Sequence, residues 1–294
     1  PDDPVTPTET SGAKVSVVTD DGFNSFHIYA FPVMKEHGIR GTHFIHTDWV
    51  DKRGWNEGPD NHMDSTRLKE LANEGHELGS HAKEHPPSGV FADYSNSELE
   101  DQLSGSKARL EGFGFDVEGF APPGGSFDDD VVEITKQHYS YLRTIEQGIN
   151  LPGYDVFRLK CYRVDNNTTL EQLDAWVKEA ADKNGWVVLL YHRFSDDPEK
   201  LQDPAMTFVS PSDFDKQMSY LADSGATVEP MGEILEVWSP SEVKEPSDPG
   251  NGNGSGRRSL PPPETIDDTG GSASSGSDGC SAGGDATSGA ALLL

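Results

Sequence analysis

Strand-like and helix-like segments alternate along most of this 294-residue chain. The strand-like segments are rich in β-branched or other apolar residues and end at turn-forming residues; they cover residues 14–18, 41–46, 76–80, 119–121, 141–144 and 186–191. The helix-like segments cover residues 31–35, 65–73, 95–111, 129–137 and 170–182, with Ser97 expected to start the third. This alternation predicts a barrel or an open α/β sheet with its chemistry at the carboxyl ends of the strands.

The two ends of the chain differ in composition from this middle part. Residues 1–12 read PDDPVTPTETSG, and residues 242–294 are dominated by Gly, Ser, Pro and Asp. Neither stretch has enough large apolar side chains to offset the entropy of ordering it. We therefore expect a disordered N-terminal segment at 1–12, one folded domain at 13–241 and a low-complexity acidic tail at 242–294.

Charge and cysteine content exclude several classes of function. The formal net charge is -28, from 51 acidic and 23 basic residues, which argues against nucleic-acid binding because phosphate contacts need clustered Lys and Arg. Only Cys161 and Cys280 occur, so neither a disulfide framework nor a cysteine-based zinc site is expected, and Cys161 should be buried. No apolar run reaches the 18 residues of a membrane-spanning helix.

The chain starts at Pro1 without Met, which we interpret as a mature or trimmed form. Its last residues, a Gly/Ser-rich stretch with a Gly-Cys pair and a final Ala-Leu-Leu-Leu, resemble the truncated start of a bacterial surface-sorting tail. We expect a secreted, periplasmic or cell-surface protein.

Four polar clusters follow predicted strands. They are Asp20-Asp21-Gly22, the pair His81 and His85, the loop Pro122-Pro123-Gly124-Gly125, and His192. Adjacent carboxylates diverge, so one can bind a metal while the other remains a base, and histidines at i and i+4 can face one metal if the segment turns helically. Each cluster also has an ordinary interpretation as a turn, a polar loop or a structural histidine.

The order of these clusters resembles the NodB-homology polysaccharide deacetylases, carbohydrate esterase family 4. Thr19-Asp20-Asp21-Gly22 is similar to T-F-D-D-G without its aromatic position, and His81-Ala82-Lys83-Glu84-His85-Pro86 is similar to H-[ST]-x-x-H-P. Ala121-Pro122-Pro123-Gly124-Gly125 is similar to R-P-P-Y-G, and Leu189-Leu190-Tyr191-His192 to L-x-L-H. The similarity spans about residues 14–231 in family order.

The resemblance implies a single distorted (β/α) barrel of NodB type that removes acetyl groups from a polysaccharide or oligosaccharide, chiefly from N-acetylglucosamine. It implies one divalent ion, Zn²⁺ with Co²⁺ or Ni²⁺ as substitutes, held by Asp21, His81 and His85. Asp20 and His192 would then be the catalytic base and acid. The backbone of Pro123 and Gly124 would stabilise the oxyanion.

Two departures from the family pattern leave alternatives open. Ala121 stands where many members carry an arginine that orients the catalytic aspartate, and Arg143, Arg158 and Arg163 are available to replace it. The fourth motif has no clear counterpart, and Asp165 is the nearest candidate for its aspartate. The alternatives are a catalytically impaired glycan-binding protein on the same fold, or a same-fold hydrolase acting on O-acetyl esters or another C–N bond.

Overall fold

The computed structural model describes residues 12–52, 58–201 and 207–238. The predicted segments 1–12 and 242–294 lie, except for Gly12, outside the described residues, so the predicted domain limits stay predictions. Among the described helices, none is long and apolar enough to cross a membrane.

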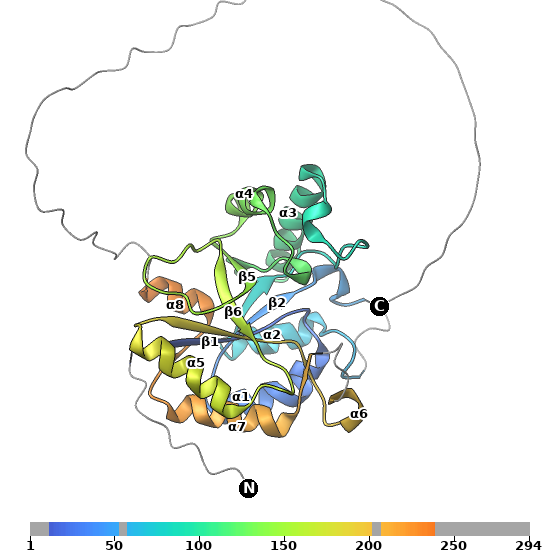
Figure 1. Cartoon of the computed structure of the whole chain (residues 1–294). Helices are drawn as coiled ribbons and strands as arrows, with labels where there is room; N and C mark the ends of the chain where they lie inside the picture. The colour runs from blue at the N-terminus through green and yellow to red at the C-terminus, as the bar shows by residue number, and fades with distance from the viewer. Residues whose placement is uncertain (1–11, 53–57, 202–206, 239–294) are drawn as a thin grey trace, which may run out of the picture. The chain divides into compact units, whose positions relative to one another are not determined.

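Seven parallel strands close into a barrel (Figure 1). The barrel strands are β1 (Lys14–Thr19), β2 (Thr42–Ile45), β3 (Glu77–Ser80), β4 (Gly119–Phe120), β5 (Tyr141–Gln147), β6 (Leu159–Arg163) and β7 (Trp186–Tyr191). Each pairs with the next, and β7 pairs with β1 along its whole length. The short β10 (Thr227–Val228) pairs with the start of β1, and β8 (Arg193–Phe194) pairs with β9 (Phe208–Val209) in a separate ribbon. The predicted distorted barrel is confirmed.

The helices surround the barrel and fill the connections between its strands (Figure 1). The α-helices are α1 (Phe31–Glu36), α2 (Ser65–Asn73), α3 (Asn96–Gly112), α4 (Asp129–His138), α5 (Leu170–Asp182), α6 (Pro198–Leu201), α7 (Pro211–Asp223) and α8 (Met231–Val237). Single turns of other helix types are η1 (Phe26–Ala30), η2 (Thr47–Trp49), η3 (Phe91–Asp93) and η4 (Pro123–Gly125). Helix α3 packs against α4, and α7 packs against α1 and α5.

The barrel wall separates two apolar cores, because side chains alternate across each strand. On β7, Trp186 and Val188 point into the barrel, whereas Val187 and Leu189 pack under the helices. This double burial explains the continuous apolar run of β7. Cys161 is buried in the inner core, as predicted.

Several elements differ from the sequence-based expectation. The start of α3 is capped by Ser95, not Ser97, because the Ser95 backbone N–H donates to the Glu98 carboxylate in a capping box. The strands and α-helices that were not predicted are β6, β8, β9, β10, α6, α7 and α8. For α7 the signals were present, since Ser210 caps it and Pro211 occupies its first turn.

A buried pair of histidines lies in the wall between β1, β2 and β3. The N–H of Gly41 donates to His76 Nδ1 at 3.2 Å, so this nitrogen carries no proton, and His43 Nε2 donates to it at 2.9 Å. The Thr19 hydroxyl then donates to His43 Nδ1 at 2.8 Å. Burial lowers the pKa of His43 well below its ordinary value and that of His76 to about 4, so both imidazole rings are neutral in the folded protein.

This pair predicts a loss of stability in acid. Because the folded-state pKa of His76 lies below its unfolded-state value of about 6.5, the unfolded chain binds more protons between about pH 4 and 6.5. The stabilisation is therefore complete above pH 6.5 and falls as the pH drops toward 4, by roughly 3 kcal/mol for His76. Urea unfolding of metal-free protein at pH 7 and 4.5 measures it. His76→Gln should flatten this pH dependence. His138→Gln, at a half-buried histidine of α4 that contacts Glu100, is the control, and equal slopes in both variants would contradict the assignment.

Candidate active site and metal centre

A cavity of about 390 Å³ opens at the carboxyl ends of the barrel strands. Its lining comes from six of the seven barrel strands or the loops that follow them: Asp20, Asp21, His81, His85, Gly124, Gly125, Ile145, Gln147, Cys161, Arg163, Leu190 and His192. The structure thus brings together most of the predicted site residues. Pro123 and Asp165 are not among the lining residues.

The two adjacent aspartates face different surroundings. Asp21 has a left-handed backbone with φ of 70°, and Gly22 follows with φ of 75°, so the chain turns sharply after β1. Asp20 is buried inside the mouth of the barrel, whereas the Asp21 side chain remains 12% exposed. The turn therefore separates two carboxylates that are neighbours in sequence.

Asp20 is held by an arginine inside the barrel. Arg143 of β5 donates from Nη2 to Asp20 Oδ1 at 2.5 Å and to Oδ2 at 2.6 Å, and its guanidinium lies 5.2 Å from the centre of the Phe44 ring. Burial alone would raise the pKa of Asp20, but the positive charge of Arg143 and the neighbouring His81 and His192 bring it below its ordinary value. Asp20 is therefore an ionised, oriented carboxylate.

Arg143 supplies the cation that Ala121 does not. Of the other two candidates, Arg158 pairs at the surface with Asp129 at 2.6 Å, and Arg163 lines the cavity. The Ala121 backbone has a different part in the site, since its carbonyl accepts a hydrogen bond from His81 Nδ1 at 2.6 Å. This bond fixes the tautomer of His81 and leaves Nε2 free to bind a metal.

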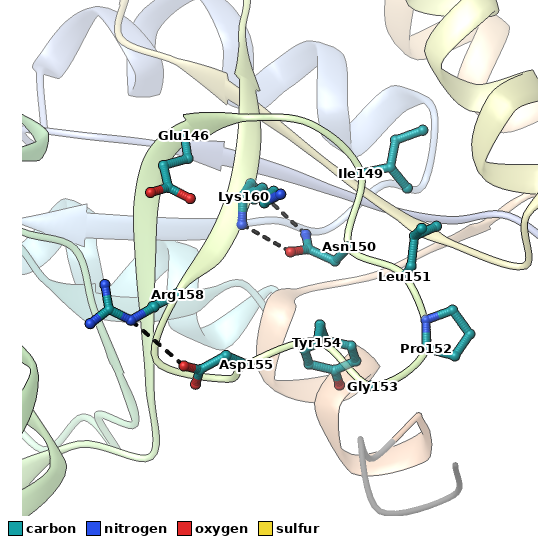
Figure 2. Close-up of a pocket in the computed structure, with 10 residues that line it drawn as sticks. All are labelled: Glu146, Ile149, Asn150, Leu151, Pro152, Gly153, Tyr154, Asp155, Arg158 and Lys160. Atoms are coloured by element: carbon teal, nitrogen blue, oxygen red, sulfur yellow. Dashed lines mark hydrogen bonds and ion pairs between the residues drawn. The ribbon is translucent and has the colours of Figure 1, made fainter. Parts of the chain in front are cut away.

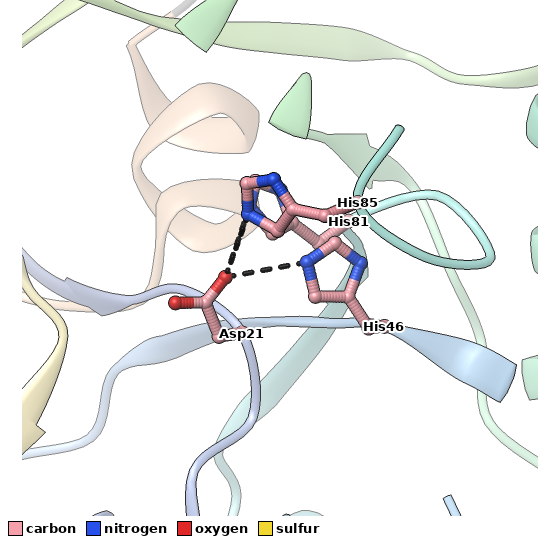
Figure 3. A group of neighbouring side chains, drawn as sticks. All are labelled: Asp21, His46, His81 and His85. Atoms are coloured by element: carbon pink, nitrogen blue, oxygen red, sulfur yellow. Dashed lines mark ion pairs between the residues drawn. The ribbon is translucent and has the colours of Figure 1, made fainter. Parts of the chain in front are cut away.

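Asp21 lies among three imidazole rings, as Figure 3 shows. Its Oδ1 is 3.2 Å from His46 Nε2 and 3.5 Å from both His81 Nε2 and His85 Nε2. One potential ligand atom from each of the four residues lies within 4.8 Å of the others. One carboxylate oxygen with imidazole nitrogens is a donor set that fits a divalent zinc-type ion.

His46 was missed in the sequence, where it appeared as the last residue of a strand. It directly follows β2, the same position that the other site residues occupy after their strands, and this placement was the available signal. The side chain is buried, and burial lowers its pKa to about 3. The imidazole is therefore neutral, the form that binds metal.

His81 and His85 converge without a helix. The segment after β3 is irregular, Ala82 adopts a left-handed backbone with φ of 59°, and Pro86 and Pro87 follow. A helical turn is therefore not needed to bring the two histidines together, because the two prolines and the backbone of Ala82 shape a loop. The loop still directs both Nε2 atoms at Asp21.

His192 follows β7, and its Nε2 lies 4.0 Å from Asp20 Oδ2. Burial lowers its pKa despite the nearby charges of Asp20 and Asp21. Its buried Nδ1 has no hydrogen-bond partner in the described part of the chain. Asp165, the candidate for the aspartate of the fourth motif, does not pair with His192. Its carboxylate instead accepts a hydrogen bond from the backbone N–H of Asn167 at 2.9 Å and closes a local turn.

The predicted oxyanion loop forms η4. Gly124 has φ of 63°, and a Cβ built there would lie 4.0 Å from His85 Cε1, so this glycine is next to the metal cluster. At Gly125 a Cβ would lie 2.3 Å from Ile145, so the loop needs a glycine to pack there. Pro123 is buried beneath this loop.

A second hollow of about 380 Å³ lies against the loop between β5 and β6 (Figure 2). Its polar groups are largely engaged with one another. The Asn150 side chain exchanges two hydrogen bonds with the backbone of Lys160, and Arg158 faces Asp155. These contacts shape the loop and do not assemble a group of acids or bases.

Residues 8–141 match the family model described as "Polysaccharide deacetylase". The family resemblance is confirmed. A curated relative, the uncharacterized protein YlxY of Bacillus subtilis, is 27% identical over 119 residues, which are 39% of this chain and 33% of that protein. The chain thus spans about a third of the length of the curated relative that it matches.

Solved structures share the fold. The Xyl-CE4 domain of a multidomain xylanase from the hindgut metagenome of Trinervitermes trinervoides has a TM-score of 0.51 at 17% identity, covering 77% of this chain and 91% of that chain. A CE4 family pseudoenzyme from Bacillus anthracis has a TM-score of 0.50 at 20% identity, covering 78% and 66%. The fold therefore occurs in a domain of a xylanase and in a pseudoenzyme, so activity has to be judged from the site.

Arg143→Met is expected to leave the Asp20 carboxylate buried without its cation. We expect a loss of about 3–5 kcal/mol in the free energy of unfolding and a rise in the pKa of Asp20 above that of the native protein. Urea unfolding and carboxyl ¹³C NMR measure these two quantities. Arg158→Met, at a surface pair, should change stability by about 1 kcal/mol or less.

The double variant Arg143→Met with Asp20→Asn should recover much of the lost stability, because no unpaired charge remains buried. Additive losses from the two substitutions would contradict a direct coupling between Arg143 and Asp20.

Proposed function

We propose that this chain is a metal-dependent polysaccharide deacetylase that hydrolyses N-acetyl groups of an N-acetylglucosamine-containing glycan. The observation that carries the proposal is the division between the two aspartates. Asp21 lies among imidazole nitrogens suited to a metal, and Asp20 is held apart by Arg143 near His192. We also propose a secreted, periplasmic or cell-surface location.

Asp21, His81 and His85 would hold one divalent ion, with Zn²⁺ favoured and Co²⁺ or Ni²⁺ as substitutes. When bound, such an ion lowers the pKa of a water molecule from near 16 to about 7 and polarises a carbonyl group. The hydrogen bond from His81 to the Ala121 carbonyl supports this role, because it holds the imidazole in the metal-binding tautomer.

The remaining residues would move protons and stabilise charge. Asp20, ionised and oriented by Arg143, would accept a proton from the attacking water. His192, whose pKa is lowered, would be neutral at rest; it would take up the proton that Asp20 accepts from the water and donate it to the departing amine. A backbone N–H of the Pro123-Gly124 loop would donate to the oxyanion, a contribution of about 3 kcal/mol for one such donor.

The alternative of a catalytically impaired glycan-binding protein rested on Ala121 and the missing fourth motif. Arg143 now accounts for the first of these, since it orients Asp20 from another strand. The second remains, because His192 Nδ1 has no acidic partner among the residues that the structure describes. The other alternative is a hydrolase of the same fold that acts on O-acetyl esters or another C–N bond. Only the substrates that the protein hydrolyses distinguish it from an N-acetyl deacetylase.

Substitutions should distinguish the two aspartates. Asp20→Asn should retain one metal ion per chain and lose turnover by on the order of 100-fold or more, because the base is gone while the ligands remain. His81→Ala should lose both metal and turnover. Metal analysis after gel filtration, together with acetate release, measures the difference. Full activity in Asp20→Asn would refute the assignment of the base.

A substrate panel tests the reaction itself. Acetate release from chitin oligomers, β-1,6-linked N-acetylglucosamine, peptidoglycan and acetylated xylan should be greatest for one of the N-acetylated glycans. A chelator should abolish it, and added Zn²⁺ or Co²⁺ should restore it. Release only from acetylated xylan would favour the esterase alternative. Glycan binding without acetate release would favour the impaired protein.

A further inference from the structure

We propose that His46 is a fourth protein ligand of the metal ion. This inference rests on the proposed function, because it extends the metal site that the deacetylation requires. The motifs that indicated Asp21, His81 and His85 include no residue of the second strand. The structure adds a ligand from this part of the chain, because His46 directly follows β2 and contacts the same oxygen, Asp21 Oδ1, as the two motif histidines.

The distances favour one shared ion. Asp21 Oδ1 lies 3.2 Å from His46 Nε2 and 3.5 Å from the Nε2 atoms of His81 and His85. Two ligands of a tetrahedral ion, at bonds of about 2.1 Å each, are separated by roughly 3.4 Å. His46 therefore fits a common ion as well as the two motif histidines do.

The surroundings of His46 also call for a partner. Its side chain is fully buried, and neither ring nitrogen has a hydrogen-bond partner within the described ranges, because the 3.2 Å contact with Asp21 lacks hydrogen-bond geometry. By contrast, His43 and His76 in the barrel wall are hydrogen-bonded to each other. A buried polar atom without a partner is unfavourable, and a metal ion accepting the lone pair of Nε2 removes that cost.

Packing holds the His46 ring at the site. The indole of Trp49 lies 4.3 Å from the His46 ring, and the His81 ring lies 4.4 Å away, centroid to centroid. Unlike His81, which donates Nδ1–H to a carbonyl, His46 has no such acceptor in the part of the chain that is described. An imidazole without this outer hydrogen bond is a weaker base and therefore a weaker ligand. We therefore expect Asp21, His81 and His85 to form the site, and His46 to add to its metal affinity.

A fourth protein ligand also changes which ions suit the site. Four protein donors complete a tetrahedral shell, so water can join only if the ion accepts five or six ligands. Co²⁺ and Ni²⁺ accept such numbers readily, and Zn²⁺ can expand to five.

Metal titration of the full chain tests this role without relying on turnover. Co²⁺ is added to metal-free protein while its visible absorption is recorded, and Zn²⁺ affinity is measured by competition with a chromophoric chelator. Losing even an outer partner of a ligand weakens binding by about 10- to 100-fold, so His46→Leu should weaken it by on the order of 100-fold and change the intensity of the Co²⁺ bands. The control His62→Gln alters another histidine that packs against Trp49, with its ring 4.4 Å from that of Trp49, and it keeps all four residues of the cluster. This variant should therefore bind metal like the native protein.

A dissociation constant within twofold of the native value, with an unchanged Co²⁺ spectrum, in His46→Leu would overturn the proposal. If thermal melting shows that His46→Leu does not fold, His46→Gln provides the same comparison. Failure of the native chain to bind any ion would overturn the proposed function as well. Native binding and acetate release, combined with unaltered binding in the His46 variant, would overturn this inference alone.

Discussion

The buried ion pair between Arg143 and Asp20 is the interaction on which the candidate site depends. Both side chains are removed from water, so each would be strongly unfavourable without the other. The guanidinium reaches both oxygens of Asp20 from inside the barrel, while Asp21 turns outward toward the histidines. Without this pair, the adjacent carboxylates of Asp20 and Asp21 would both be available to bind the metal ion.

The barrel supplies the geometry around that pair. All its strands are parallel, so their carboxyl ends meet on one rim, and short polar segments after different strands face one cavity. The irregular backbones at Asp21 and Ala82, both with positive φ, lie where the chain leaves β1 and β3. Such conformations are tolerated because the rigid strands on either side hold the loops in place.

The sequence indicated much of this arrangement because its signals are local. The alternation of strand and helix patterns predicted a barrel or an open α/β sheet, and the family resemblance chose the barrel. Compact motifs indicated Asp20, Asp21, His81 and His85. Arg143 could only be offered as one of three arginines, because it lies 123 positions from Asp20 and a lone arginine in a strand has no distinguishing pattern. His46 was taken as the last residue of a predicted strand, whereas β2 ends at Ile45 and His46 follows it at the rim of the barrel.

The central claim is that the two adjacent aspartates divide their roles between metal and proton. The most direct test is a crystal structure of the protein grown with Zn²⁺, with the ion located by anomalous scattering. The account predicts one ion bonded to an oxygen of Asp21 and to Nε2 of His81 and His85, with Asp20 outside the coordination shell and still paired with Arg143. An ion bound through Asp20, or an Asp20 turned away from Arg143, would contradict it.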